Sequence, residues 1–192
     1  MNDFIFYFTI GWFHIMSSAA TDHLFFITIL AIIYSFADWR KVLILVTAFT
    51  IGHAITLFMS VLNLLSLNSE IVEFLIPCTI LVTAIMNLFL KKDRGISHQI
   101  QYGIALGFGL VHGLGFANYI RMMVSVDQQL VWALFSFNLG LEAGQIVVVC
   151  FVLLTVWLSS RIHANAHLRW VSIVSTFVLL FALKLAIDRF PF

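Results

Sequence analysis

The sequence predicts an all-α polytopic membrane protein, a bundle of six transmembrane helices plus a short N-terminal apolar segment that is left open as a seventh. Of its 192 residues, 62% are hydrophobic and only 10% are charged, whereas a soluble domain carries about 25% charged residues. The apolar residues run in blocks close to the 20 or so residues that an α-helix needs to cross a bilayer. Strands are not expected, because no stretch alternates with period two and lipid admits only helices or closed barrels.

The last five spans are predicted at full length. Short polar stretches bound each of them, such as Arg40-Lys41 before the first and residues 66–70 after it. The predicted spans are residues 42–65, 71–90, about 101–123, 130–158 and 168–187. No internal repeat or long linker divides the chain, so residues 1–192 are expected to form a single integral membrane domain.

The N-terminal part is less regular. Residues 4–16 and 23–37 are both apolar but short, and the polar residues 17–22 join them. We expect residues 23–37 to be the remaining span, tilted or in a locally thin membrane. Residues 4–16 do not resemble a signal peptide, because Asp3 precedes the apolar stretch and no Lys or Arg does.

Basic residues predict the orientation. Seven of the ten Lys and Arg residues fall in loops on one side of the six-span arrangement. Cytoplasmic loops of membrane proteins are enriched in Lys and Arg, so this side is expected to be the cytoplasm, in a bacterial inner membrane. The net charge of +1, with no basic stripe, argues against a nucleic-acid partner. The seven residues are Arg40, Lys41, Lys91, Lys92, Arg94, Arg161 and Arg169.

Ionisable residues far from span ends are the candidates for a functional site. His53 lies roughly 18 Å along its span, and His112 and Glu142 lie similarly deep. A charge at mid-bilayer costs about 2.5–3.5 kcal/mol, so such residues usually mark a site. A further group is expected nearer the outer surface, where it would begin a path to the midplane: His14, Asp22, His23 and Glu73.

Helical spacing places more polar side chains beside these candidates. Asn138, Glu142 and Gln145 share one helix face, and Thr50 lies on the face of His53. Imidazole with carboxylate suits divalent ions such as Ni²⁺, Co²⁺ and Zn²⁺. Cys78 and Cys150 lie in apolar runs and are expected only to pack. Any one of the polar residues could instead bond a neighbouring helix, but together they predict a cation or proton site.

Blocks of sequence in a fixed order resemble the HupE/UreJ membrane proteins. They are WFH at residues 12–14, TDHLFF at 21–26, TAFTIGHAITL at 47–57, VEF at 72–74, FGLVHGLGFA at 108–117 and FNLGLEAGQ at 137–145. The spacing from the first His to the Asp-His pair is longer here than in the family. That family is regarded as hydrogenase and urease accessory proteins, thought to be nickel or cobalt permeases. The resemblance implies the metal-site residues His14, Asp22, His23, His53, His112 and Glu142.

The sequence and the resemblance together predict a permease for a divalent transition-metal ion. Nickel or cobalt is the expected cargo, with Zn²⁺ also suited to the ligands. Supporting or path residues are expected to be Glu73, Thr50, Asn138 and Gln145. The alternatives are an intramembrane metal-dependent hydrolase, with three ligands and an open position, and a non-catalytic membrane partner that delivers metal. Expected partners are lipid, the metal ion, and accessory membrane or metal-maturation proteins.

Overall fold

The computed structural model describes residues 3–17, 20–89, 97–123, 130–162 and 166–191. Within these residues it contains α-helices, one short 3-10 helix and no strand, which confirms the predicted all-α class. The helices are α1 (Asp3–Met16), α2 (Thr21–Ala31), η2 (Phe36–Asp38), α3 (Trp39–Val61), α4 (Ser69–Phe89), α5 (His98–Met123), α6 (Leu130–Ile162) and α7 (Ala166–Asp188).

The structure has five single-helix spans, and six, as predicted, when the bent pair α1 and α2 is counted as one span. The helices α3 to α7 are each long and apolar enough to cross a membrane. The helices α1 and α2 pass the same test only together, and they are bent by 71° at a short break. The expectation that residues 23–37 cross alone is wrong, because α2 ends at Ala31 after 11 residues, about 16 Å. The bent pair α1 and α2, counted as one unit and called the broken span below, stands where a tilted helix and a separate N-terminal segment were predicted.

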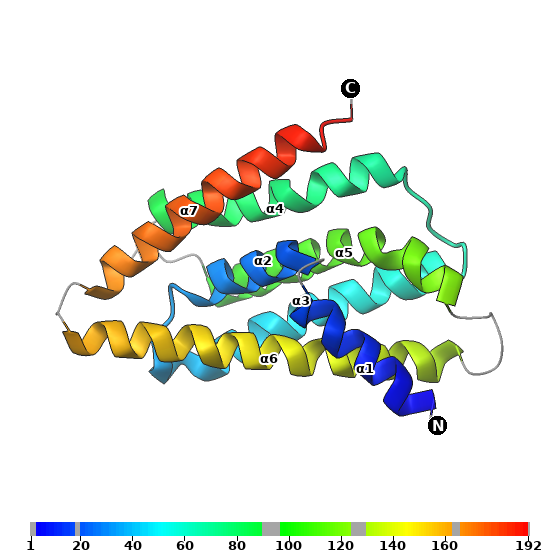
Figure 1. Ribbon diagram of the computed structural model, residues 1–192, viewed down its shortest axis with the longest axis horizontal. Helices are drawn as coiled ribbons and strands as arrows, with labels where there is room; N and C mark the ends of the chain where they lie inside the picture. Colours follow the sequence, from blue (N-terminus) through cyan, green and yellow to red (C-terminus); the bar gives the residue numbers. More distant parts are fainter. Residues whose placement is uncertain (1–2, 18–19, 90–96, 124–129, 163–165, 192) are drawn as a thin grey trace.

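The helices pack as three extensive pairs, with α2 between them. The pairs are α3 with α5, α1 with α6, and α4 with α7; the last pair forms the upper layer in Figure 1. The helix α2 contacts both α4 and α6. It buries His23, Phe26, Ile27, Ile29 and Ala31, which lie on several sides of the helix. A helix that buries side chains on several sides needs neighbours around it, so the helix pairs enclose α2, whereas α1 buries only Gly11 and Ile15.

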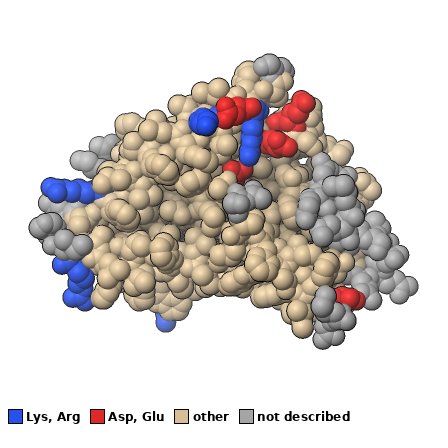
Figure 2. Space-filling model, viewed as in Figure 1, with Lys and Arg blue, Asp and Glu red and all other residues tan. Residues whose placement is uncertain are grey.

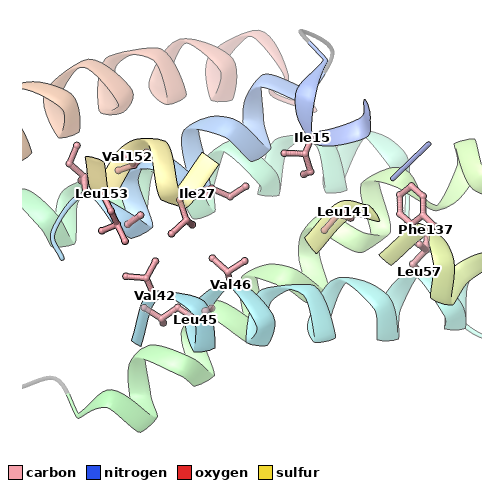
Figure 3. Packing of buried hydrophobic residues seen from close by; sticks show 14 of the residues in the cluster. Ile15, Ile27, Val42, Leu45, Val46, Leu57, Phe137, Leu141, Val152 and Leu153 are labelled. Atoms are coloured by element: carbon pink, nitrogen blue, oxygen red, sulfur yellow. The ribbon is translucent and has the colours of Figure 1, made fainter. Parts of the chain in front are cut away.

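Apolar side chains fill the interior and also cover the outside. Figure 3 shows Ile15 of α1, Ile27 of α2, Val46 of α3 and Leu141 of α6 in one buried cluster. Many large apolar side chains are exposed as well, for example Trp132 with 70% of its surface accessible. Apolar patches of this extent do not occur on a soluble monomer, and they match a surface that faces lipid.

Glycines set the close approach of α3 to α5. A Cβ atom at Gly52 would meet the backbone of α5, and one at Gly109 or Gly113 would meet the backbone of α3. Small residues allow membrane helices to approach closely and pack by dispersion. The two helices that carry the deep histidines are therefore held at short range by their backbones.

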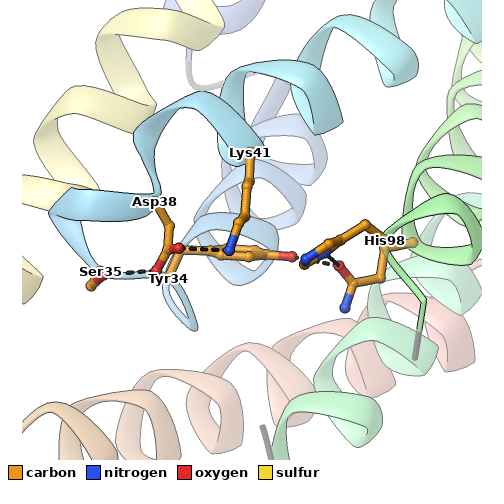
Figure 4. Close-up of polar contacts among 6 residues, drawn as sticks. Tyr34, Ser35, Asp38, Lys41 and His98 are labelled. Atoms are coloured by element: carbon orange, nitrogen blue, oxygen red, sulfur yellow. Dashed lines mark hydrogen bonds and ion pairs between the residues drawn. The ribbon is translucent and has the colours of Figure 1, made fainter. Parts of the chain in front are cut away.

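Polar contacts fix the turn between α2 and α3 (Figure 4). Asp38 accepts hydrogen bonds from Ser35 Oγ at 2.7 Å and from Lys41 Nζ at 2.9 Å. Tyr34 donates its hydroxyl to Gln101 Oε1 at 3.0 Å, which ties the turn to the start of α5. Burial raises the pKa of Tyr34 to about 12, so the hydroxyl keeps the proton it donates. These contacts stop the helix that the apolar pattern alone would have continued.

Four described basic residues lie at the end of the bundle that holds the turn between α2 and α3. They are Arg40 and Lys41 beside the start of α3, Arg161 near the end of α6 and Arg169 near the start of α7. Figure 2 shows Lys and Arg at the matching left-hand end of the molecule. Three residues of the predicted cytoplasmic set lie outside the described residues: Lys91, Lys92 and Arg94. The cytoplasmic assignment of this end stays a prediction, which the shared position of the four described residues supports.

Candidate metal centre

The break between α1 and α2 brings together histidines from its two sides. His14 lies in the last turn of α1, and His23 lies in the first turn of α2. Their ring centroids are 4.8 Å apart. The sequence placed both residues near the outer surface. They lie instead beside the deep residue His53, because each short helix covers only part of the span.

The helices α3 and α5 complete a group of imidazole rings. The His23 ring lies 5.9 Å from that of His53 and 5.0 Å from that of His112. One ring nitrogen from each of His14, His23 and His53 can be chosen so that all lie within 4.8 Å of one another. His14, His23, His53 and His112 are called the histidine cluster below. Four separate helices supply its members.

The histidine cluster holds buried nitrogens with no hydrogen-bond partner among the described residues. They are Nε2 of His14, His23 and His112, and both ring nitrogens of His53. An unpartnered buried polar atom costs about 1–3 kcal/mol, so several in one place call for a ligand. The Nδ1 atom of His112 lies 2.8 Å from the Phe108 carbonyl oxygen. This contact assigns the proton to Nδ1 and leaves the Nε2 lone pair free, the arrangement typical of a metal-binding histidine.

Aromatic side chains surround the cluster. Phe116 lies 3.9 Å from the His14 ring between centroids, and Phe49 lies 5.1 Å from the His112 ring. Phe137 stacks against His53 at 6.3 Å. Such a wall lowers the local dielectric constant, which strengthens electrostatic interactions with any ion held inside. The donor set and its surroundings therefore fit a borderline transition-metal ion, which accepts imidazole nitrogen readily.

The candidate carboxylates occupy different positions. Asp22 precedes His23, and its Oδ2 accepts a hydrogen bond from Arg189 Nη1 at 2.8 Å. Its other oxygen is buried and has no partner among the described residues. Glu142 accepts a hydrogen bond from Thr47 Oγ1 at 2.6 Å and lies outside the histidine group. Glu73 is exposed and lines a small pocket at the start of α4.

The supporting polar residues lie between α3 and α6. Thr50 Oγ1 donates to Gln145 Oε1 at 2.9 Å. Asn138 Nδ2 donates to the Leu134 carbonyl oxygen of its own helix at 2.7 Å, and its Oδ1 is buried without a partner among the described residues. The structure thus joins α3 to α6 by polar contacts next to the histidine cluster.

Sequence reasoning missed Arg189, the partner of Asp22. Its position identifies it only as part of the polar end of the last span, and nothing in the pattern pairs residues 167 positions apart. The sequence also places His98, His163 and His167 in loops, where they are predicted to be solvated. His167 is instead half-buried, with Nε2 3.2 Å from the Ile32 carbonyl oxygen. His98 is exposed, as predicted, and His163 lies outside the described residues.

Comparison with known proteins assigns the family. A search of curated proteins found no match, and a search of solved structures found none either. A family model described as HupE / UreJ protein matches residues 1–189, almost the whole chain. Together with the apolar spanning helices, this match shows that the chain is an integral membrane protein of the HupE/UreJ family.

Proposed function

We propose that this protein is a permease of the bacterial inner membrane for a divalent transition-metal ion, nickel or cobalt, which the histidine cluster binds in transit. The HupE/UreJ family is associated with nickel or cobalt transport and with urease and hydrogenase maturation. The observation that carries the proposal is the set of buried, unpartnered ring nitrogens in the cluster. Neutral imidazoles in this number suit Ni²⁺ and Co²⁺ better than they suit an alkali ion.

In this proposal the broken helix is the centre of the binding site. His14 and His23 supply ligands from its two halves, and His53 and His112 supply ligands from α3 and α5. Many transporters bind substrate near the bilayer midplane, between the halves of a discontinuous helix. The negative end of the α1 dipole lies at the break and favours a cation there. Asp22 in the first turn of α2 offsets the positive dipole end of that helix.

Polar pairs continue from the cluster toward the predicted cytoplasmic end. On α3, Thr50 lies about one helical turn from His53 and Thr47 about one turn further toward that end. Their partners Gln145 and Glu142 run in the opposite order because α6 is antiparallel to α3, so the two pairs lie side by side at about the same depth. The pairs offer oxygen atoms to an ion that leaves the cluster on this side, whereas a hydrolase with a closed three-ligand site has no need of them. They therefore favour transport over the hydrolytic alternative and give Glu142 a role on the exit path.

Metal binding is the first test. The full chain, purified in detergent without chelator, is titrated with Ni²⁺, Co²⁺ and Zn²⁺ by calorimetry. We expect stoichiometric binding by the wild type, lost in His53→Ala and in His112→Ala because each removes a ligand. His98→Ala is the matched control, since that ring is exposed and lies outside the cluster. A wild-type protein that takes up none of the three ions would disprove a metal-binding function.

Transport is the second test and separates the alternatives. Protein in liposomes is exposed to external Ni²⁺, and a trapped nickel-sensitive dye reports entry. A permease produces entry that depends on His53. A hydrolase or a metal-delivery partner binds the ion but produces no entry, so binding without entry would reject the permease while keeping the site.

A further inference from the structure

The ion pair between Asp22 and Arg189 joins the histidine cluster to the end of the chain. Arg189 follows α7 directly, and its Nη1 lies 2.8 Å from Asp22 Oδ2. The side chain of Asp22 is only 13% exposed and that of Arg189 is 31% exposed. Charges withdrawn from water to this extent are costly unless they are paired. Each partner therefore depends on the other while no other ion is near.

Asp22 is the carboxylate best placed to share its charge with an ion in the cluster. It directly precedes His23 in the first turn of α2, and its Oδ1 is buried without a partner among the described residues. Neutral imidazoles bind a divalent ion without reducing its charge, so a nearby carboxylate lowers the cost of holding that ion in a low-dielectric site. In the structure the guanidinium of Arg189 already compensates this carboxylate. Arg189 and an incoming metal ion would therefore compete for the same negative charge.

The end of α7 has a further contact with its surroundings. Phe190 packs edge-to-face on Phe74 of α4, with ring centroids 5.4 Å apart. The backbone N–H of Arg189 donates to the Leu185 carbonyl oxygen at 3.0 Å, which continues the last turn of α7 itself. At the other end of α7, His167 contacts the Ile32 carbonyl oxygen after α2, so the ion pair is the polar link described between the last turn of α7 and the broken span. A change at Asp22 is thus transmitted to the last turn of α7.

We propose that Arg189 is a positioning residue that competes with the transported ion for Asp22 and so sets the affinity of the histidine cluster. Without metal, Arg189 holds Asp22. When a divalent ion enters the cluster, the Asp22 carboxylate turns toward the ion, the ion pair opens, and the Arg189 side chain is released to solvent. This inference rests on the proposed metal-binding function. It adds a residue outside the histidine cluster that determines the affinity for the metal ion.

Nickel titration of purified full-length variants tests the competition. We expect Arg189→Gln to bind Ni²⁺ roughly tenfold more tightly than the wild type, within the range typical of coupled sites. Arg189→Lys keeps the competing cation and stays near the wild-type affinity. Lys184→Gln is the matched control, because it removes an exposed cation from the same helix and leaves Asp22 paired. In an Asp22→Asn background, Arg189→Gln should change nothing further.

Amide hydrogen exchange of the wild type, measured with and without Ni²⁺, tests the same competition without a variant. Saturating Ni²⁺ should speed exchange of the amides of residues 186–190, because the ion pair that holds this turn has opened. Asp22→Asn should show the fast exchange without metal. An unchanged or weaker Ni²⁺ affinity in Arg189→Gln, or slower exchange on adding Ni²⁺, would overturn the competition while leaving the metal site in place. A wild type that binds no Ni²⁺, Co²⁺ or Zn²⁺ would overturn both proposals.

Discussion

Replacing His53 with leucine should stabilise the metal-free protein, which is unusual for a buried histidine. The His53 side chain is fully buried, and neither ring nitrogen has a hydrogen-bond partner among the described residues. Two unpartnered polar atoms together cost about 2–6 kcal/mol. Exchange for an apolar side chain of similar size costs less than about 1.5 kcal/mol in packing. The free energy of unfolding should therefore rise by about 1–4 kcal/mol.

Thermal unfolding in detergent with a chelator measures this gain. In a protein of this size, 1 kcal/mol shifts the unfolding midpoint by about 2–4 °C, so His53→Leu should unfold about 2–16 °C above the wild type. Adding Ni²⁺ should raise the unfolding midpoint of the wild type above that of His53→Leu. Ligand at a hundred times its dissociation constant stabilises the wild type by about 2.7 kcal/mol, and the variant has lost the site.

The sign of the shift separates two explanations of the cluster. If the histidines form a structural hydrogen-bond network, His53→Leu leaves partners unsatisfied and lowers the midpoint by several degrees. That result would refute the reasoning. His98→Leu controls for a general effect of removing a histidine, because exposed substitutions usually stay within about 0.5 kcal/mol.

Other consequences are open to direct measurement. Nickel affinity should fall as the pH is lowered, because protons compete for imidazole lone pairs, and calorimetry over a series of pH values checks it. Gly113→Leu should destabilise the protein by about 1–3 kcal/mol, because its side chain meets the backbone of α3, whereas Gly103→Leu enters open space and should leave the unfolding midpoint unchanged. Glu142→Gln should slow nickel entry into liposomes while keeping the unfolding midpoint, since the amide oxygen still accepts the hydroxyl of α3. Cysteines introduced at Ser69 and Lys92 should react with impermeant reagents from opposite sides of the membrane, and labelling from the same side would contradict the predicted orientation.

Most of the fold follows from the sequence, because span length is set by bilayer thickness. The predicted spans 71–90 and 168–187 differ from α4 and α7 by only one or two residues at each end. The separation of α1 from α2 falls at the polar residues 17–22 that the sequence singles out, but the early end of α2 does not follow, since the apolar residues continue beyond Ala31. The stop at Ala31 depends on contacts of Tyr34 with α5, which lie far away in the sequence.

The sequence identifies the histidines of the candidate site better than it identifies the carboxylates. Depth within a span points to His53 and His112, and the structure joins them to His14 and His23. Depth also pointed to Glu142, which instead pairs with Thr47 on α3. Neighbours across helices decide such pairings, and helical spacing within one segment carries no information about them. Arg189 is the clearest case, because its partner lies at the other end of the chain.

The aromatic wall of the histidine cluster has a consequence for the abundant cations of the cell. An ion could reach ring nitrogens packed among Phe49, Phe116 and Phe137 only after it lost most of its water shell. Magnesium gives up water reluctantly, and both Mg²⁺ and Ca²⁺ seek oxygen ligands rather than the nitrogens found here. Ions that are scarce but bind nitrogen strongly would recover the lost hydration energy, so in the proposed site the aromatic wall and the imidazole rings would select against far more concentrated competitors.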